Sequence, residues 1–160
     1  MGMEWGCSLQ WAEMQGVDCQ DLSIRNRLIL NPLEATKEIV RRHKVTGIAA
    51  PAAEWALDYS YGCIGKGWWA LPSVNELYQI VRYKQEIVEC YCHMSLKTNN
   101  FLHHFFWSCT CPPECYLARV IRVFWDTIED DMYWNYAHRK GRASVIPVTN
   151  PPIDIECNII

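Results

Sequence analysis

The sequence contains no long apolar run and no concentration of positive charge. No stretch of the 160-residue chain approaches the roughly 20 consecutive apolar residues that cross a bilayer. The formal net charge is −3, whereas a nucleic-acid-binding domain usually carries a basic stripe. The densest basic cluster, residues 41–44, ends a predicted helix, where cations interact favourably with the helix dipole. We therefore expect neither membrane insertion nor nucleic-acid binding.

The sequence also lacks a secretory signal, because residues 1–7 contain neither a basic region nor an apolar core. The expectation is a soluble chain, or a processed form of an exported one. The nine cysteines are an odd number, so at least one would lack an intramolecular partner. Reduced thiols are the default without a signal, and disulfides within residues 109–115 are the alternative if the protein is exported. The sequence thus leaves the compartment open.

Enzyme motifs are missing as well. The glycine-rich turn at residues 61–67 is not followed by the Gly-Lys-Ser/Thr ending of a phosphate loop. No Gly-x-Ser-x-Gly elbow is present. A hydrolase triad would have to combine Ser108, a histidine at 103 or 104, and Asp126, and a chain with five histidines yields such a set by chance. We predict a protein that is not an enzyme.

Two helices are predicted in the first half of the chain. Asn31 is a favoured N-cap and Pro32 suits the first helical position, so a helix is expected over residues 32–44. It should stop near Gly47. A second helix is expected over residues 51–60, where alanine and aromatic residues recur on one face.

A third helix and several strands follow. Ser73 and Glu76 form a capping-box pattern, and apolar residues at helical spacing extend the predicted helix over residues 73–89. Apolar alternation and aromatic content predict strands beyond it. They are expected at residues 68–72, 105–108, 117–125, 132–137 and 143–149. Helices come first and strands last, which indicates a single α+β domain over 1–160 with an antiparallel sheet and a tail at 150–160.

Four motifs in order resemble one known family. The first is the helix and turn from Ala-Ala-Glu at 52–54 to Tyr-Ser-Tyr-Gly at 59–62. The others are Gly-Trp-Trp-Ala-Leu-Pro-Ser-Val-Asn-Glu-Leu at residues 67–77, Phe-Trp-Ser-Cys-Thr at 106–110, and Gly-Arg-Ala-Ser-Val-Ile-Pro-Val at 141–148. The chain is similar, over roughly residues 50–149, to the C-type lectin-like domains of bacterial surface paralogues and phage-encoded variable proteins. These domains are distantly similar to formylglycine-generating enzymes. The closing motif departs from the family pattern. In that pattern Arg and Val precede the proline, and here they are replaced around Val145 and Ile146.

The resemblance implies a C-type lectin-like fold that displays its C-terminal half on one exposed face. In the phage variable proteins a diversity-generating retroelement varies that half, and the face binds protein or glycan ligands in adhesion to a target cell. A virion or bacterial cell-surface location follows from the same resemblance. The family needs no calcium, and the Glu-Pro-Asn and Gln-Pro-Asp triplets of calcium-dependent sugar binders are missing here. No cofactor is expected.

Three alternatives remain beside this ligand-binding module. A structural or assembly component of a virion or fimbria would form homo-oligomers. An oxidoreductase of the formylglycine-generating type would use cysteines on the same fold, but its Gly-Phe-Arg ending and its Gly-Asn-Val-x-Glu-Trp stretch are missing. A zinc site could draw on Cys109, Cys111 and Cys115, with cysteines and histidines upstream, but the spacing is wrong for a zinc ribbon.

The predicted binding face is rich in tyrosine, tryptophan and arginine, the residue types that dominate binding hot spots. A loop that also contains Pro112, Pro113 and Cys115 would shape its rim. Trp107 and Phe124 are instead expected in the core. The ligand-binding candidates are Cys109, Cys111, Glu114, Tyr116, Arg119, Arg122, Trp125, Tyr133, Trp134, Asn135, Tyr136, His138 and Arg139.

Overall fold

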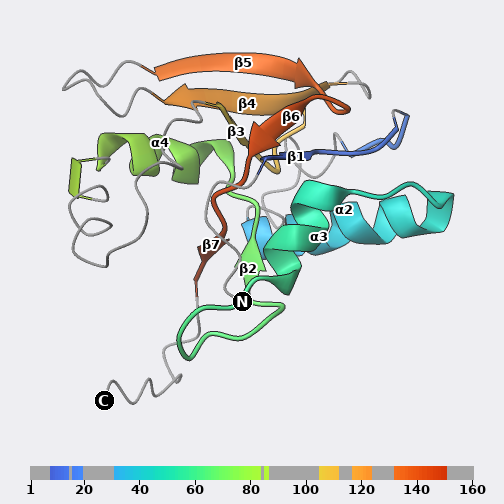
Figure 1. The fold of residues 1–160 in the computed structure, drawn as a ribbon, viewed down its shortest axis with the longest axis horizontal. Helices are drawn as coiled ribbons and strands as arrows, with labels where there is room; N and C mark the ends of the chain where they lie inside the picture. Colours follow the sequence, from blue (N-terminus) through green and yellow to red (C-terminus); the bar gives the residue numbers. More distant parts are fainter. Residues whose placement is uncertain are drawn as a thin grey trace.

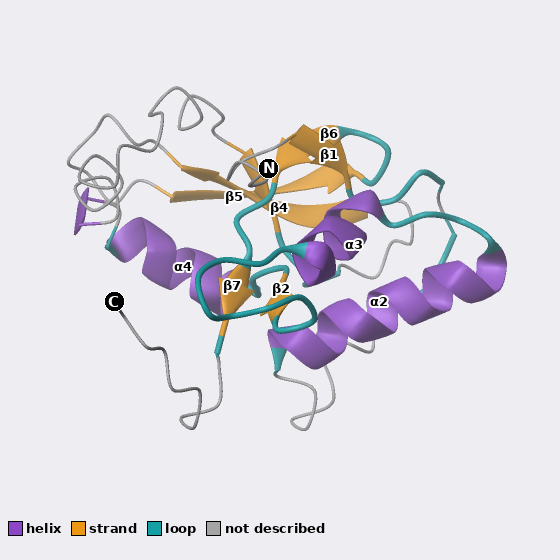
Figure 2. Ribbon diagram, turned by 60° about the horizontal axis from the view of Figure 1, so that its bottom comes forward, coloured by secondary structure: helices purple, strands orange, loops and turns teal. Residues whose placement is uncertain are grey.

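The computed structural model describes residues 8–14, 16–19, 31–83, 85–86, 105–111, 117–123 and 132–150. Over these residues the chain forms three α-helices, a five-stranded sheet and a two-stranded sheet, which confirms the predicted α+β class. Figure 1 shows β4 and β5 side by side at one end of the molecule, helices α2 and α3 grouped together, and α4 apart from them. The β2–β7 pair lies between α4 and the α2–α3 group in Figure 1 and in Figure 2.

The helices are α2 (Pro32–Thr46), α3 (Pro51–Asp58) and α4 (Val74–Arg82). The strands are β1 (Ser8–Gln10), β2 (Trp69–Ala70), β3 (Phe105–Trp107), β4 (Leu117–Val123), β5 (Met132–His138), β6 (Arg142–Ser144) and β7 (Val148–Thr149).

The helix starts are those that the capping patterns predict. The Asn31 side chain accepts a hydrogen bond from the Leu33 amide at 2.9 Å, and α2 ends at Gly47, whose φ of 71° is left-handed. At α4 the Ser73 hydroxyl accepts from the Glu76 amide and the Glu76 carboxylate accepts from the Ser73 amide. The helix ends at Arg82, earlier than predicted, and residues 84 and 87–89 of the predicted span lie outside the described residues.

The sheet is mixed, so the prediction of an antiparallel sheet is only partly right. The strand order is β1-β6-β3-β4-β5, and β3 pairs with β6 in parallel through Phe106 and Ser144. The single strand predicted over residues 143–149 is wrong, because β6 joins the large sheet while β7 pairs with β2. The residues between them, Val145 to Pro147, are buried. The sequence predicts one continuous strand here because the residues that connect β6 to β7 are also apolar.

Two apolar clusters lie on opposite faces of β3 and β4. Phe106 and Ile121 pack with Leu77 of α4 in one cluster. Trp107 and Val120 pack with residues of α2, α3 and the N-terminal segment in the other. Successive residues of a strand point to opposite faces, so the centre of the sheet is covered on both sides. The prediction that Trp107 belongs to the core is confirmed.

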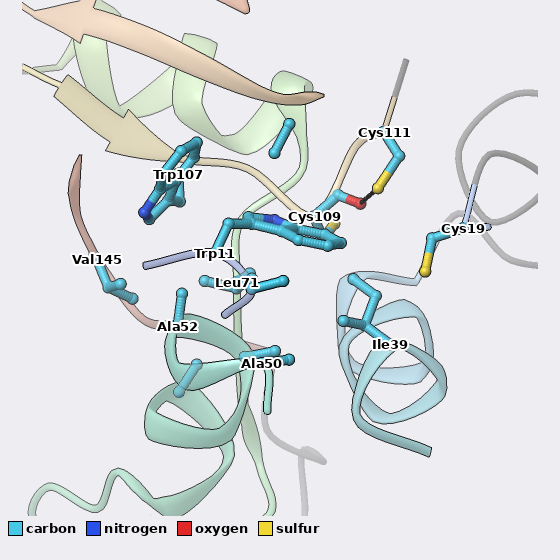
Figure 3. Packing of buried hydrophobic residues seen from close by; sticks show 14 of the residues in the cluster. Trp11, Cys19, Ile39, Ala50, Ala52, Leu71, Trp107, Cys109, Cys111 and Val145 are labelled. Carbon is cyan, nitrogen blue, oxygen red and sulfur yellow. Dashed lines mark hydrogen bonds between the residues drawn. The ribbon is translucent and has the colours of Figure 1, made fainter. Parts of the chain in front are cut away.

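Two buried tryptophans attach the N-terminal segment to the sheet. The Trp11 indole Nε1–H donates to the Ser108 carbonyl oxygen at 3.0 Å, and the Trp107 indole Nε1–H donates to the Leu9 carbonyl oxygen at 2.7 Å. Figure 3 shows Trp11 in the middle of the larger cluster, close to Leu71 and Cys109. Buried indoles usually satisfy their N–H group in this way.

Candidate binding surface

Arg119 of β4 and Tyr136 of β5 form an aromatic–arginine pair on the surface. The two residues are register partners in the antiparallel ladder. The Arg119 Nη2–H donates to the Tyr136 hydroxyl at 2.7 Å, and the guanidinium carbon lies 5.1 Å from the centre of the Tyr136 ring. Tyr136 is still 47% exposed. The pair therefore presents a large ring to solvent in a fixed orientation, which agrees with the prediction that Tyr136 points outward.

His138 continues this surface along β5. It lies two residues beyond Tyr136, so strand alternation places both side chains on the same face. His138 is exposed and is the register partner of Leu117, which is half-buried. We call the surface of Arg119, Tyr136 and His138 the β4–β5 surface.

Arg122 belongs to a different surface. It lies three residues from Arg119 on β4, so the two side chains point to opposite faces of the sheet. The Arg122 guanidinium carbon lies 5.5 Å from the centre of the Phe105 ring, and these two residues are register partners in β3 and β4. Both are exposed. The residues predicted to form one binding face therefore lie on two faces of the sheet. Arg119 lies on one face and Arg122 on the other.

Three predicted surface residues are buried, and their assignment to an exposed face is wrong. Cys109 is 4% exposed, Cys111 is 1% exposed and Arg139 has no exposed surface. The two cysteines pack in the larger apolar cluster directly after β3. Their position beside polar and proline residues in the sequence suggested a loop rim, but the 109–111 segment runs beneath the sheet instead of around it.

Arg139 is an internal anchor. Its Nε–H donates to the Leu117 carbonyl oxygen at 2.9 Å, and its Nη1–H donates to the Val17 carbonyl oxygen at 2.6 Å. Its guanidinium carbon lies 4.5 Å from the centre of the Trp11 ring. Its own carbonyl oxygen accepts from the Ala12 amide at 3.1 Å. The side chain therefore joins the end of β5 to the start of β4 and to the N-terminal segment.

His43 completes this internal polar group. Its Nδ1 lies 2.7 Å from the Ile39 carbonyl oxygen, which can only accept, so Nδ1 carries the hydrogen. The ring meets Trp11 edge-on with the centroids 5.6 Å apart. Its Nε2 is buried with no hydrogen-bond partner among the described residues. Burial lowers the pKa of His43, and the charge of Arg139 acts in the same direction, so the ring is neutral at pH 7.

The remaining candidates cannot be placed on either face. Tyr133, Trp134 and Asn135 belong to β5, but their side chains lie outside the described residues. Glu114, Tyr116, Trp125 and the core prediction for Phe124 also fall outside the described residues, as do Pro112, Pro113 and Cys115.

Sequence reasoning missed Phe105 as a partner of Arg122, and it missed Trp11, Cys19 and His43 as neighbours of Arg139. Phe105 could have been found from the register of β3 against β4, because an aromatic residue opposite an arginine is a favourable cross-strand pair. The neighbours of Arg139 come from two distant segments, the N-terminal segment and α2, and no local pattern connects them with Arg139.

Within the described part of the chain, no three histidine, cysteine or acidic side chains gather closely enough to hold a metal ion. The cysteines and histidines upstream of Cys109 that the zinc alternative would need lie outside that part. None of the three helices combines the length and the apolar character that a membrane span requires.

Comparisons with known proteins give no relative. No family model matches the chain, and neither the curated proteins nor the solved structures contain a match. The similarity to C-type lectin-like domains therefore rests on the sequence motifs alone and stays a prediction.

Proposed function

We propose that this protein is a ligand-binding module that uses the β4–β5 surface to bind a protein or glycan on a target cell. Recognition would take place by surface complementarity, without catalysis or cofactor. The observation that carries the proposal is the Arg119–Tyr136 pair, in which an exposed ring is held by a hydrogen bond and by the facing guanidinium.

The physical argument concerns conformational entropy. A tyrosine has few rotatable bonds, and a ring that is already fixed loses little freedom when a ligand covers it. Arg119 gives the pair a cationic edge beside the apolar ring face. Protein hot spots and sugar-stacking sites both use this combination of an apolar face and a polar edge.

The proposal includes a C-type lectin-like fold, which the motifs at residues 67–77, 106–110 and 141–148 support. In the structure the first motif forms β2 and the start of α4, the second forms β3 and the segment after it, and the third forms β6. If the chain is a retroelement-diversified variable protein, its genome should carry a nearby reverse-transcriptase gene and a near-identical template copy of the region 105–148. A genome without both would remove that part of the proposal.

The experiment uses a charge reversal on either face of the same strand. The purified protein, Arg119→Glu and its matched control Arg122→Glu are applied to an array of defined glycans and to an array of purified cell-surface protein domains. The parent should bind a small set of spots. Arg119→Glu should lose those spots and Arg122→Glu should keep them, because only Arg119 lies on the β4–β5 surface.

Circular dichroism spectra and melting curves of both variants must match the parent for this comparison to count. Equal loss of binding in the two variants would place the site elsewhere. Retention of binding by Arg119→Glu would reject the proposed surface.

A second candidate is an assembly role, because β5 is an outermost strand of the described sheet. An outermost strand has backbone groups available for pairing with another chain. Light scattering at increasing protein concentration separates the two functions. A stable homo-oligomer that binds no array ligand would favour assembly.

A further inference from the structure

Three buried cysteines come together from two distant parts of the chain. Cys19 lies in the segment after β1, while Cys109 and Cys111 follow β3. All three are buried, and none of them forms a disulfide. Figure 3 shows Cys19 and Cys111 on the same side of the larger apolar cluster, to the right of Trp11.

Cys19 and Cys111 are direct neighbours. Their side chains share a hydrogen bond, in which Cys111 is the donor and the Cys19 sulfur the acceptor. The Cys111 sulfur also lies 3.7 Å from the Cys109 carbonyl oxygen. The Cys111 S–H therefore has two acceptors within reach, one of which is supplied by a segment distant in the sequence.

The surroundings make the two thiols chemically different. The hydrogen bond from Cys111 lowers the pKa of Cys19, and the positive charges of Arg139 and Arg42 act in the same direction against the effect of burial. The hydrogen bond to Cys19 and burial raise the pKa of Cys111. Cys19 is thus the thiol of the pair that ionises first, and a thiolate is the reactive form in disulfide exchange.

We propose that Cys19 and Cys111 are a modification site at which a small-molecule disulfide, such as oxidised glutathione, converts the two thiols into a structural disulfide. The bond would fix the segment 16–19 against the 109–111 segment. The Val17 carbonyl oxygen that accepts from Arg139 lies within the fixed segment. Oxidation would therefore also hold the internal anchor in place.

The reaction balances in two exchange steps. The Cys19 thiolate attacks one sulfur of the glutathione disulfide, forms a mixed disulfide and releases one glutathione thiolate. Cys111 then loses its proton and attacks the Cys19 sulfur, which releases the second glutathione thiolate. The two protons of the protein thiols end on the two glutathione thiols. The protein pair is oxidised by two electrons and the small disulfide is reduced by the same two.

Two other cysteines supply a precedent and a control. Cys63 is disulfide-bonded, and since Cys19, Cys109 and Cys111 form no disulfide, its partner is not one of the described cysteines. This bond differs from the reduced thiols expected from the sequence. Burial raises the pKa of Cys109 to about 12, so that thiol should stay unreactive although it lies two residues from Cys111.

The test begins with the reduced parent protein, which is incubated with oxidised glutathione at pH 8. Remaining thiols are alkylated, and the protein is digested and mapped by mass spectrometry. We expect a cross-linked peptide that joins Cys19 to Cys111, and an alkylated Cys109. Both thiols are buried, so the small disulfide reaches them only through a local opening of the structure, and low concentrations of urea should accelerate exchange.

Variants give an independent readout. In the parent and in the control Cys109→Ser, oxidation should raise the melting temperature through the new cross-link. In Cys19→Ser and Cys111→Ser, the increase in melting temperature that the Cys19–Cys111 cross-link causes should be absent. The proposal is overturned if Cys19 and Cys111 of the folded parent are both recovered alkylated after Cys63 has become oxidised. It is equally overturned if Cys19 is cross-linked to a different cysteine.

Discussion

The guanidinium carbon of Arg139 lies 4.5 Å from the centre of the Trp11 ring, and neither side chain is exposed to solvent. This contact connects the end of the β-hairpin β4–β5 to a segment more than a hundred residues earlier. The same guanidinium donates to the carbonyl oxygens of Leu117 and Val17. The strands that display Arg119 and Tyr136 are therefore held from beneath by an internal arginine.

Removing this anchor should cost more stability than removing a surface arginine. Arg139→Ala leaves two buried carbonyl acceptors without a donor, and each unsatisfied group costs about 1–3 kcal/mol. The free energy of unfolding from urea titration should fall by about 3 kcal/mol or more. Arg119→Ala, measured in the same way, should change it by less than about 1 kcal/mol because that side chain is partly exposed. Equal effects of the two substitutions would mean that Arg139 is no anchor.

Stability should depend on pH through His43. Its pKa is lowered in the folded state by burial and by the charge of Arg139, whereas the unfolded chain has the ordinary value of about 6.5. Between the folded and the unfolded pKa the unfolded chain binds more protons, so this contribution is present above about pH 6.5 and is lost as the pH falls.

The slope from this single group is at most about 1.4 kcal/mol per pH unit. Urea titrations of the parent between pH 7 and pH 5 should show declining stability. His43→Phe retains an aromatic ring beside Trp11 but cannot titrate, so its decline should be shallower. Parallel pH profiles for the two proteins would contradict the neutral, buried state of His43.

The capping box of α4 should contribute to stability. Ser73→Ala removes the hydroxyl that accepts from the Glu76 amide, and loss of an N-cap costs about 1 kcal/mol. Chemical denaturation should report that decrease in the free energy of unfolding. Ser60→Ala is the control, because Ser60 is exposed and caps no described helix. A Ser73→Ala variant as stable as the control would show that the box adds nothing.

Adjacent residues of α4 allow a paired test of the second apolar cluster. Leu77 is fully buried with Phe106 and Ile121, and Tyr78 is 49% exposed. Leu77→Ala should lower the free energy of unfolding by about 2–5 kcal/mol, since it leaves a cavity between the helix and the sheet. Tyr78→Ala should have a small effect in the same denaturation experiment. A small effect of Leu77→Ala would mean that α4 does not pack as described.

Local sequence signals were sufficient for the helices. Asn31 with Gly47 fixed the two ends of α2, and Ser73 with Glu76 fixed the start of α4, because caps involve residues within one turn of each other. The strand β1 was not predicted, since it forms only through pairing with β6 from the other end of the chain. The sequence did not predict the change of sheet between β6 and β7, because residues 143–148 are all apolar or small and look like one continuous strand.

The sequence predicted which residue types form the candidate surface, but it did not predict on which face of the sheet each residue lies. Tyrosine and arginine on neighbouring strands correctly indicated the exposed pair Arg119–Tyr136. The separation of Arg122 onto the other face follows from alternation once the strand is known. The burial of Arg139 could not be predicted, because its partners Trp11 and Val17 are supplied by a distant segment.

The most direct test of the account compares two tyrosines of similar exposure. Tyr136 on the β4–β5 surface is 47% exposed, and Tyr61 in the glycine turn after α3 is 51% exposed. The dissociation constant of each alanine variant is measured by calorimetry against the ligand that the arrays identify. We predict that Tyr136→Ala weakens binding at least tenfold, about 1.4 kcal/mol, with an unchanged melting temperature, while Tyr61→Ala binds like the parent. Parental affinity in a folded Tyr136→Ala variant would contradict the central claim.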